Sequence, residues 1–104
     1  MNGPEIEFDW DEANIAHIAK HDVKPHEAEE VITRNPLDLD YVLRNGEGRF
    51  VQVGETLDRR VLVVVSTLRD DKIRVVSARP ANRKHRLPYQ RMMEQQNDRE
   101  ESSS

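Results

Sequence analysis

A run of five consecutive apolar residues, from Val61 to Val65, constrains the fold of this chain more than any other feature. Side chains of a β-strand point alternately to the two faces of its sheet, so a strand with this sequence is apolar on both faces. Such a strand is typical of the interior of a sheet. We therefore expect a central strand here, covered by helices on one side.

The segments around this run complete the predicted sheet. Stretches rich in strand-forming residues alternate with short turns, and we expect strands at Leu37–Leu43, Arg49–Thr56, Val61–Leu68 and Lys72–Ala78. The turns between them lie at Asn45–Gly48, Leu57–Arg60 and Asp70–Asp71. Because short turns join antiparallel neighbours, the sequence predicts a four-stranded, mainly antiparallel meander.

The N-terminal segment has the alternation of one more short strand. Polar and apolar residues alternate over Glu5–Trp10, which predicts a half-buried strand. Its apolar face is formed by Ile6, Phe8 and Trp10. We expect Trp10 to belong to the core rather than to stack on a ligand.

Two helices are expected before the sheet. The first runs from Glu12 to His21 and is capped by Asp9 or Asp11. Its predicted buried stripe consists of Ile15, Ile18 and Ala19. The second begins at Pro25, because proline fits the first turn of a helix, and stops at Asn35-Pro36. Its predicted buried stripe consists of Ala28, Val31 and Ile32.

The C-terminal part is basic at first and then polar. After Ala78 the chain enters a basic segment that extends to about Met93 and is helical in composition, with Pro88 inside it. Residues 97–104 are polar, which predicts a disordered tail. We thus expect a single α+β domain over residues 1–96, in which the two N-terminal helices and a C-terminal helix pack on the sheet.

Composition excludes several classes of protein. The 104 residues contain no cysteine, which excludes disulfides, thiolate zinc sites and a cysteine nucleophile. The longest apolar run falls far short of the about 18 residues that a membrane-spanning helix needs, and Met1–Glu5 lacks the features of a signal peptide. We therefore expect a soluble, cytoplasmic protein with no membrane partner.

The net charge of −4 hides a strong segregation of charge along the chain. Residues 1–58 carry 5 basic and 14 acidic side chains, whereas residues 69–91 carry 8 basic and 2 acidic ones. The second stretch has the electrostatic footprint of a phosphate-binding face. A solvated surface without function would show the same split, so the sequence leaves both interpretations open.

Several stretches of the chain resemble the BrnT family of type II toxins. The stretch FDWDEANIAHIAKHDV, from Phe8 to Val23, is similar to the N-terminal signature of that family, and PHEAEEVI is similar to its second helix. GEGRF, VLVVVSTLRDDKIRVVSAR and the pattern RK…Y of Arg83, Lys84 and Tyr89 resemble its hairpin, central strands and final helix. The resemblance implies a compact RelE-like fold and an endoribonuclease that inhibits translation and needs no metal or other cofactor.

The same resemblance implies a protein partner. A BrnA-like antitoxin with a ribbon-helix-helix DNA-binding part would hold the toxin inactive. Because ribbon-helix-helix proteins are dimers, two copies of each chain are expected in a 2:2 complex. Operator DNA would then be bound only through the antitoxin.

Arg79 and Arg83 are the leading candidates for catalysis of RNA cleavage. Such cleavage without a metal needs cations that stabilise charge on the phosphorane, and groups that accept and donate protons. Guanidinium suits the first task, because its planar fork matches phosphate oxygens and stays charged. Arg79 ends the last strand and Arg83 lies in the following helix, so both can reach one phosphate. Alternatively, Arg79 pairs with a carboxylate of the acidic half.

His21 and Tyr89 are the candidates for proton transfer. A histidine near its free pKa exchanges protons at neutral pH, and a tyrosine can donate a proton or stack on a base. Both residues also have structural interpretations, His21 as a hydrogen-bonded histidine and Tyr89 as a ring that packs the last helix. His17 and His21 are four residues apart, but the glutamate of an HExxH motif and a third ligand are lacking, so no metal site is predicted.

Four further basic residues are candidate RNA contacts, namely Lys20, Arg49, Lys84 and Arg86. Arg49 is equally a candidate contact for the antitoxin. Two other functions stay open: a non-catalytic module whose basic face docks an acidic partner or DNA, and a ParE-like gyrase inhibitor. Both fit the same fold class, because related small scaffolds host several activities.

Overall fold

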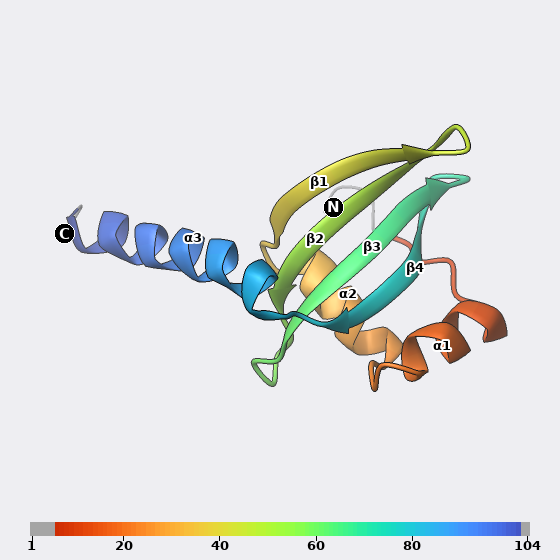
Figure 1. Cartoon of the computed structure of the whole chain (residues 1–104), viewed down its shortest axis with the longest axis horizontal. Coiled ribbons are helices and arrows are strands. Elements are labelled where there is room, and N and C mark those ends of the chain that lie inside the picture. Colours follow the sequence, from red (N-terminus) through yellow and green to blue (C-terminus); the bar gives the residue numbers. More distant parts are fainter. Residues whose placement is uncertain (1–5, 103–104) are drawn as a thin grey trace, which may run out of the picture.

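The computed structural model describes residues 6–102, with side chains described for residues 6–97. In chain order its elements are α1 (Glu12–Ala19), α2 (Pro25–Thr33), β1 (Leu37–Arg44), β2 (Glu47–Glu55), β3 (Val61–Arg69), β4 (Lys72–Pro80) and α3 (Arg83–Ser102). Figure 1 shows one twisted sheet with the helices arranged around it. This RelE-like arrangement confirms the predicted α+β class.

The four strands form an antiparallel meander in the order β1-β2-β3-β4. The β1–β2 turn has positive φ at both central residues, 52° at Asn45 and 79° at Gly46, and the β3–β4 turn likewise has 52° at Asp70 and 63° at Asp71. Two central residues with positive φ match the right-handed twist of the flanking strands, and Asn, Asp and Gly adopt this conformation at low cost. The meander predicted from the sequence is therefore confirmed.

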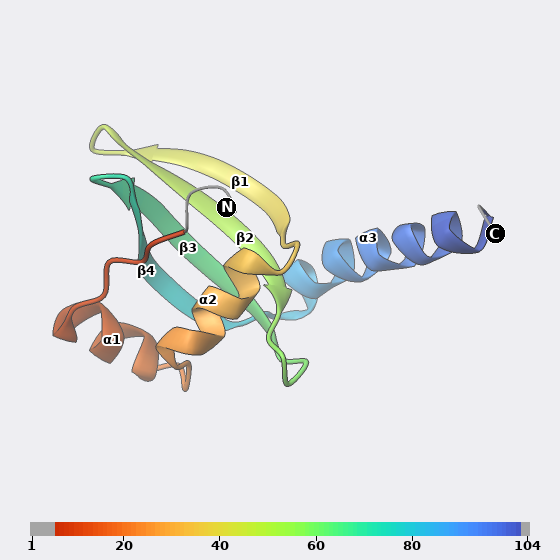
Figure 2. The same ribbon diagram turned by 180° about the vertical axis from the view of Figure 1, so that it is seen from behind.

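One face of the sheet is covered by α2, which crosses in front of the strands in Figure 2, and by α1, which lies next to β4. Ile18 of α1, together with Ala28 and Val31 of α2, packs on strand residues such as Leu62 and Val64, and all five are fully buried. Trp10 packs against the same cluster and its indole Nε1 donates to Glu29 Oε2 at 2.7 Å. The burial of Ile18, Ala28 and Val31 was predicted, as was the role of Trp10.

The opposite face of the sheet is covered at one end only, by α3. Tyr89 packs there with Val53 and Val63, and Met92 and Met93 of the same helix join this cluster. The alternating side chains of β3 thus serve two clusters, Leu62 and Val64 on one face and Val63 on the other. We expected helices on one side of the central strand, but the structure places them on both.

The strand predicted over Glu5–Trp10 is wrong as a full strand. Glu5 lies outside the described residues, and the rest makes a single parallel bridge between Phe8 and Ile73. Two backbone hydrogen bonds hold the segment to β4, from Asp9 N to Ile73 O at 2.8 Å and from Ile73 N to Glu7 O at 2.9 Å. Phe8 and Trp10 are half-buried as predicted, but Ile6 is 56% exposed, and Asp11 begins the cap of α1 so soon afterwards that no ladder can extend.

The first helix ends earlier than predicted, at Ala19 instead of His21. Asp11 is its N-cap: the Asp11 carboxylate accepts from Asn14 N at 2.9 Å, and the Asn14 side chain accepts from Asp11 N at 2.7 Å. Of the predicted stripe only Ile18 is buried, while Ile15 is 39% exposed. An eight-residue helix turns one narrow face to the sheet, and that face consists of Asn14 and Ile18.

The last helix is longer than predicted. It passes Met93 and runs to Ser102, so residues 97–102 of the expected tail lie within α3, while residues 103 and 104 are outside the described part. Pro88 lies inside the helix and removes one backbone hydrogen bond, to the Lys84 carbonyl, without ending it. Beyond its contact with β1 and β2, α3 projects away from the sheet (Figure 1).

Candidate functional site

The connection between β4 and α3 is fixed by backbone hydrogen bonds. Ala81 N donates to the Val61 carbonyl at 2.9 Å, which continues the pairing of β3 beyond the end of β4. Asn82 then caps α3, since its side-chain oxygen accepts from His85 N at 3.1 Å. The N-terminus of a helix carries a partial positive charge. This end of α3 is therefore suited to an anion before any side chain is considered.

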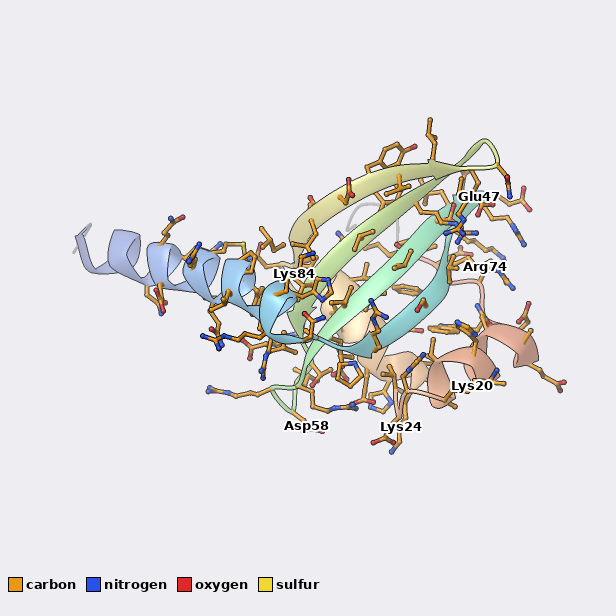
Figure 3. All side chains as sticks on the ribbon, viewed as in Figure 1. Lys20, Lys24, Glu47, Asp58, Arg74 and Lys84 are labelled. Carbon is orange, nitrogen blue, oxygen red and sulfur yellow. The ribbon has the colours of Figure 1, made fainter. Side chains whose placement is uncertain are left out.

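Four basic side chains surround this helix start, and we call them the basic cluster: Arg79, Arg83, Lys84 and Arg86. All four are exposed, and among the described residues none has a carboxylate partner within 4.0 Å. Arg79 continues across the sheet the row formed by Val53 and Val63, the two strand residues on which Tyr89 packs. Figure 3 shows Lys84 at the start of α3.

Three carboxylates of the acidic half pair with arginines outside the basic cluster. Arg74 contacts Asp11 at 2.8 Å and Asp9 at 3.5 Å, and Arg60 contacts Glu27 at 2.7 Å. The Asn14 backbone N–H and the Arg74 guanidinium lower the pKa of Asp11. The alternative was that Arg79 pairs with a carboxylate of the acidic half, but the described residues contain no such ion pair.

Glu27 is the most buried of these carboxylates, at 7% exposure. Burial alone would raise its pKa, but the Lys24 backbone N–H and the Arg60 guanidinium outweigh this effect and lower the pKa of Glu27. The ion pair with Arg60 therefore ties α2 to the start of β3. Its role is structural, on the face of the sheet that α2 covers.

Arg49 lies at the opposite end of the sheet from the basic cluster. Its Nε is 3.6 Å from Glu47 Oε1, and Arg69 approaches the other oxygen of Glu47 at 3.8 Å. With Arg74 these residues line a small hollow of about 240 Å³. Figure 3 shows Glu47 and Arg74 at this end, remote from Lys84. The structure thus does not bring Arg49 together with Arg79 and Arg83.

Lys20 and His21 lie just after α1 and are both exposed. The rings of His17 and His21 are 6.4 Å apart, and among the described residues no group of three His, Asp or Glu side chains is placed to hold a metal ion. Figure 3 places Lys20 on the α1 side of the molecule, away from Lys84. Within the described part of the chain, no hydrogen bond or ion pair joins His21 to the basic cluster.

Tyr89 is 4% exposed, so its ring has a structural role in packing α3 on the sheet. Burial, and then the nearby Glu55 carboxylate, raise the pKa of Tyr89. The hydroxyl therefore stays protonated at neutral pH, and in proton transfer it can act only as an acid. Glu55, the carboxylate beside it, belongs to β2, which β3 separates from Arg79 on β4.

Comparison with protein families decides what class of protein carries this fold. Residues 10–85 match the family described as the ribonuclease toxin BrnT of type II toxin–antitoxin systems. The chain belongs to the BrnT family. A search of curated proteins finds no match. Within the described residues no helix is long and apolar enough to cross a membrane.

The BrnT match covers most of the candidate residues but not all. It includes Arg79, Arg83 and Lys84, and it ends at His85, before Arg86 and Tyr89. Family membership as a ribonuclease toxin favours nuclease activity over the binding module and the gyrase inhibitor. It also implies an RNA substrate and an antitoxin partner.

Sequence reasoning missed three side chains that surround the Tyr89 hydroxyl in this BrnT chain. Arg34 follows α2, Glu55 ends β2, and Arg59 lies in the β2–β3 turn; together with Tyr89 they line a cavity of about 610 Å³. Arg34 precedes Glu55 by 21 residues, and Tyr89 follows Arg59 by 30 residues, so no spacing pattern connects these three segments. The one available signal was the unusual pair Arg59-Arg60 in a turn.

Proposed function

We propose that this BrnT toxin cleaves RNA at the basic cluster, with Arg79 and Arg83 binding the phosphate that is cut. The observation that carries the proposal is that the four side chains of the cluster are exposed, without a carboxylate partner among the described residues, and gathered at a helix N-terminus. A fixed cationic site of this kind is complementary to the extra negative charge of a phosphorane. Lys84 and Arg86 supply contacts to neighbouring phosphates.

The proposed reaction needs no metal ion. The 2′-oxygen of the ribose attacks the adjacent phosphorus, the bond to the 5′-oxygen breaks, and a proton moves from the 2′-hydroxyl to the leaving oxygen. Arg79 and Arg83 hold the phosphate and stabilise the charge on its oxygens, a task that a metal ion performs in other nucleases. His21 is our candidate for proton transfer, because histidine is the side chain type that commonly serves as a general acid or base.

We propose that the partner is a BrnA-like antitoxin whose acidic and apolar side chains cover the basic cluster. Complementary charge would speed association and block RNA at the same surface. A ribbon-helix-helix dimer would assemble two toxin chains in a 2:2 complex and carry it to operator DNA. A toxin released from the antitoxin would degrade RNA and so inhibit translation.

The test is expression of the chain without its antitoxin, with growth and total RNA followed over time. The double variant Arg79→Ala/Arg83→Ala should permit growth and leave RNA intact. Arg44→Ala is the matched control, since Arg44 is an exposed arginine at the opposite end of the sheet. If the double variant arrests growth and degrades RNA as the wild type does, the proposed phosphate site is wrong. Growth arrest with intact RNA would favour gyrase inhibition instead.

A further inference from the structure

The cavity of about 610 Å³ beside Tyr89 has no part in the function proposed above. It lies between the end of α2, the β2–β3 turn and the second to fourth turns of α3. Its polar lining is supplied by Arg34, Asn35, Glu55, Arg59, Tyr89 and Asn97. The volume is within the range of small-molecule binding sites, about 300–1,000 Å³. Two guanidinium groups beside one carboxylate give the cavity attraction for an anion that also carries hydrogen-bond donors.

Arg59 is presented to this cavity by a rigid turn. Thr56 is buried, and its hydroxyl oxygen accepts from Arg60 N at 3.0 Å while its carbonyl accepts from Arg59 N at 2.9 Å. From α2, Glu30 Oε1 accepts from Leu57 N at 2.8 Å. Arg59 itself has a φ of 65°, a conformation that is uncommon for residues other than glycine, asparagine and aspartate. The backbone at Arg59 is therefore held at a defined place on the rim, from which its exposed side chain lines the cavity.

Arg34 and Glu55 also line the cavity, next to this turn. Arg34 donates through one terminal nitrogen to the Glu55 backbone carbonyl at 3.2 Å, which orients its guanidinium and leaves other donors available. The Glu55 carboxylate has no salt bridge among the described residues and lies beside the Tyr89 hydroxyl. A carboxylate accepts about four hydrogen bonds, so one from Tyr89 leaves it able to receive donors from a ligand.

We propose that this cavity binds one nucleotide of the RNA substrate, with its phosphate at Arg59 and Arg34 and an exocyclic amino group of its base at Glu55. The inference rests on the proposed function for its substrate. Tyr89 lies six residues after Arg83 on the same helix, about 9 Å along the axis, so one RNA strand can reach both sites. Glutamate accepts from the amino group of cytosine, whereas uracil has a carbonyl oxygen at that position. The site should therefore select bases with an amino group.

The test compares binding of 5′-CMP and 5′-UMP to the purified chain, followed by NMR chemical shifts. The two nucleotides have the same size and phosphate and differ at the group that faces Glu55. We expect CMP to bind about tenfold more tightly than UMP, as one charge-assisted hydrogen bond would give. Glu55→Gln should abolish the preference, because an amide offers both an acceptor and a donor.

Arg59→Asn should weaken the binding of both nucleotides about tenfold without changing the ratio of the CMP and UMP affinities. Asparagine tolerates the positive φ, so the turn should keep its fold, and an unchanged melting temperature verifies this. Arg44→Ala, which also removes one positive charge, should leave binding unchanged. These binding measurements need no cleavage, so they can be repeated in the Arg79→Ala/Arg83→Ala variant. Nucleotide binding in that variant tests the cavity independently of whether the basic cluster is the site of cleavage.

Three results would overturn the inference. Equal binding of CMP, UMP and inorganic phosphate would show a general anion site. No shifts at the cavity residues with either nucleotide would show that it does not receive RNA. Loss of antitoxin binding in Glu55→Gln and Arg59→Asn, with nucleotide binding unchanged, would assign the cavity to the antitoxin.

Discussion

Replacing Arg79 and Arg83 singly and together should slow RNA cleavage in a way that reveals whether they hold one phosphate. Removing one donor to a charged transition state costs about 3 kcal/mol, so each alanine variant should lower kcat/KM about a hundredfold. If both guanidinium groups bind the same phosphate, the double variant should lose less than the product of the two single effects. The lysine variants should fall between alanine and wild type, since lysine keeps the charge but loses the planar fork.

The structure predicts that these variants remain folded. Both side chains are exposed and make no salt bridge among the described residues, so each replacement should change the free energy of unfolding by less than about 0.5 kcal/mol. The assay is the initial rate on a short labelled RNA, with unfolding by urea in parallel and Arg44→Ala as control. Wild-type rates in both single variants would refute the reasoning, and so would rate losses that follow a loss of stability.

Further outcomes follow from the same structure. RNA cleavage should survive excess EDTA, because cationic side chains supply the charge stabilisation; loss on chelation and recovery with a divalent ion would contradict this. His21→Gln should slow cleavage about a hundredfold, and a wild-type rate in this variant would remove His21 from the mechanism. Glu27→Gln should cost about 1.5 kcal/mol in urea unfolding at pH 7, through the weakened bond to Arg60. Because folding lowers the pKa of Glu27, the wild type has the full contribution of this carboxylate to the free energy of unfolding above the ordinary carboxyl pKa. It loses that contribution as the pH falls through the pKa of the folded state. The free energy of unfolding of the variant should therefore fall less steeply at acid pH.

The sequence predicts the sheet well because its strands obey local rules. The apolar run in β3 requires burial on both faces, and Asn45-Gly46 and Asp70-Asp71 supply the positive φ values that their turns need. The errors occur where tertiary contacts decide. Ile15 fits the helical period of α1, but a helix of eight residues has too narrow a contact with β4 to bury it.

The candidate site could be predicted only in part, for a related reason. Arg79 and Arg83 are close in sequence and the strand–helix junction keeps them close in space. The neighbours of Tyr89 come from three separate segments, so their association depends on how the β2–β3 turn and α3 meet. Spacing within a sequence carries no information about such a contact, which is seen only in the folded chain.

Segregation of charge in this chain has a structural consequence for its inhibition. Three carboxylates of the acidic half already pair with other arginines, Asp9 and Asp11 with Arg74 and Glu27 with Arg60, and among the described residues no carboxylate lies within 4.0 Å of the basic cluster. An inhibitor must therefore bring its own acidic groups to the start of α3. On this reasoning, complex formation should protect amides in residues 69–91 from hydrogen exchange and abolish RNA cleavage together. Protection confined to residues 1–58 in a complex that still cuts RNA would rule out inhibition by covering the basic cluster.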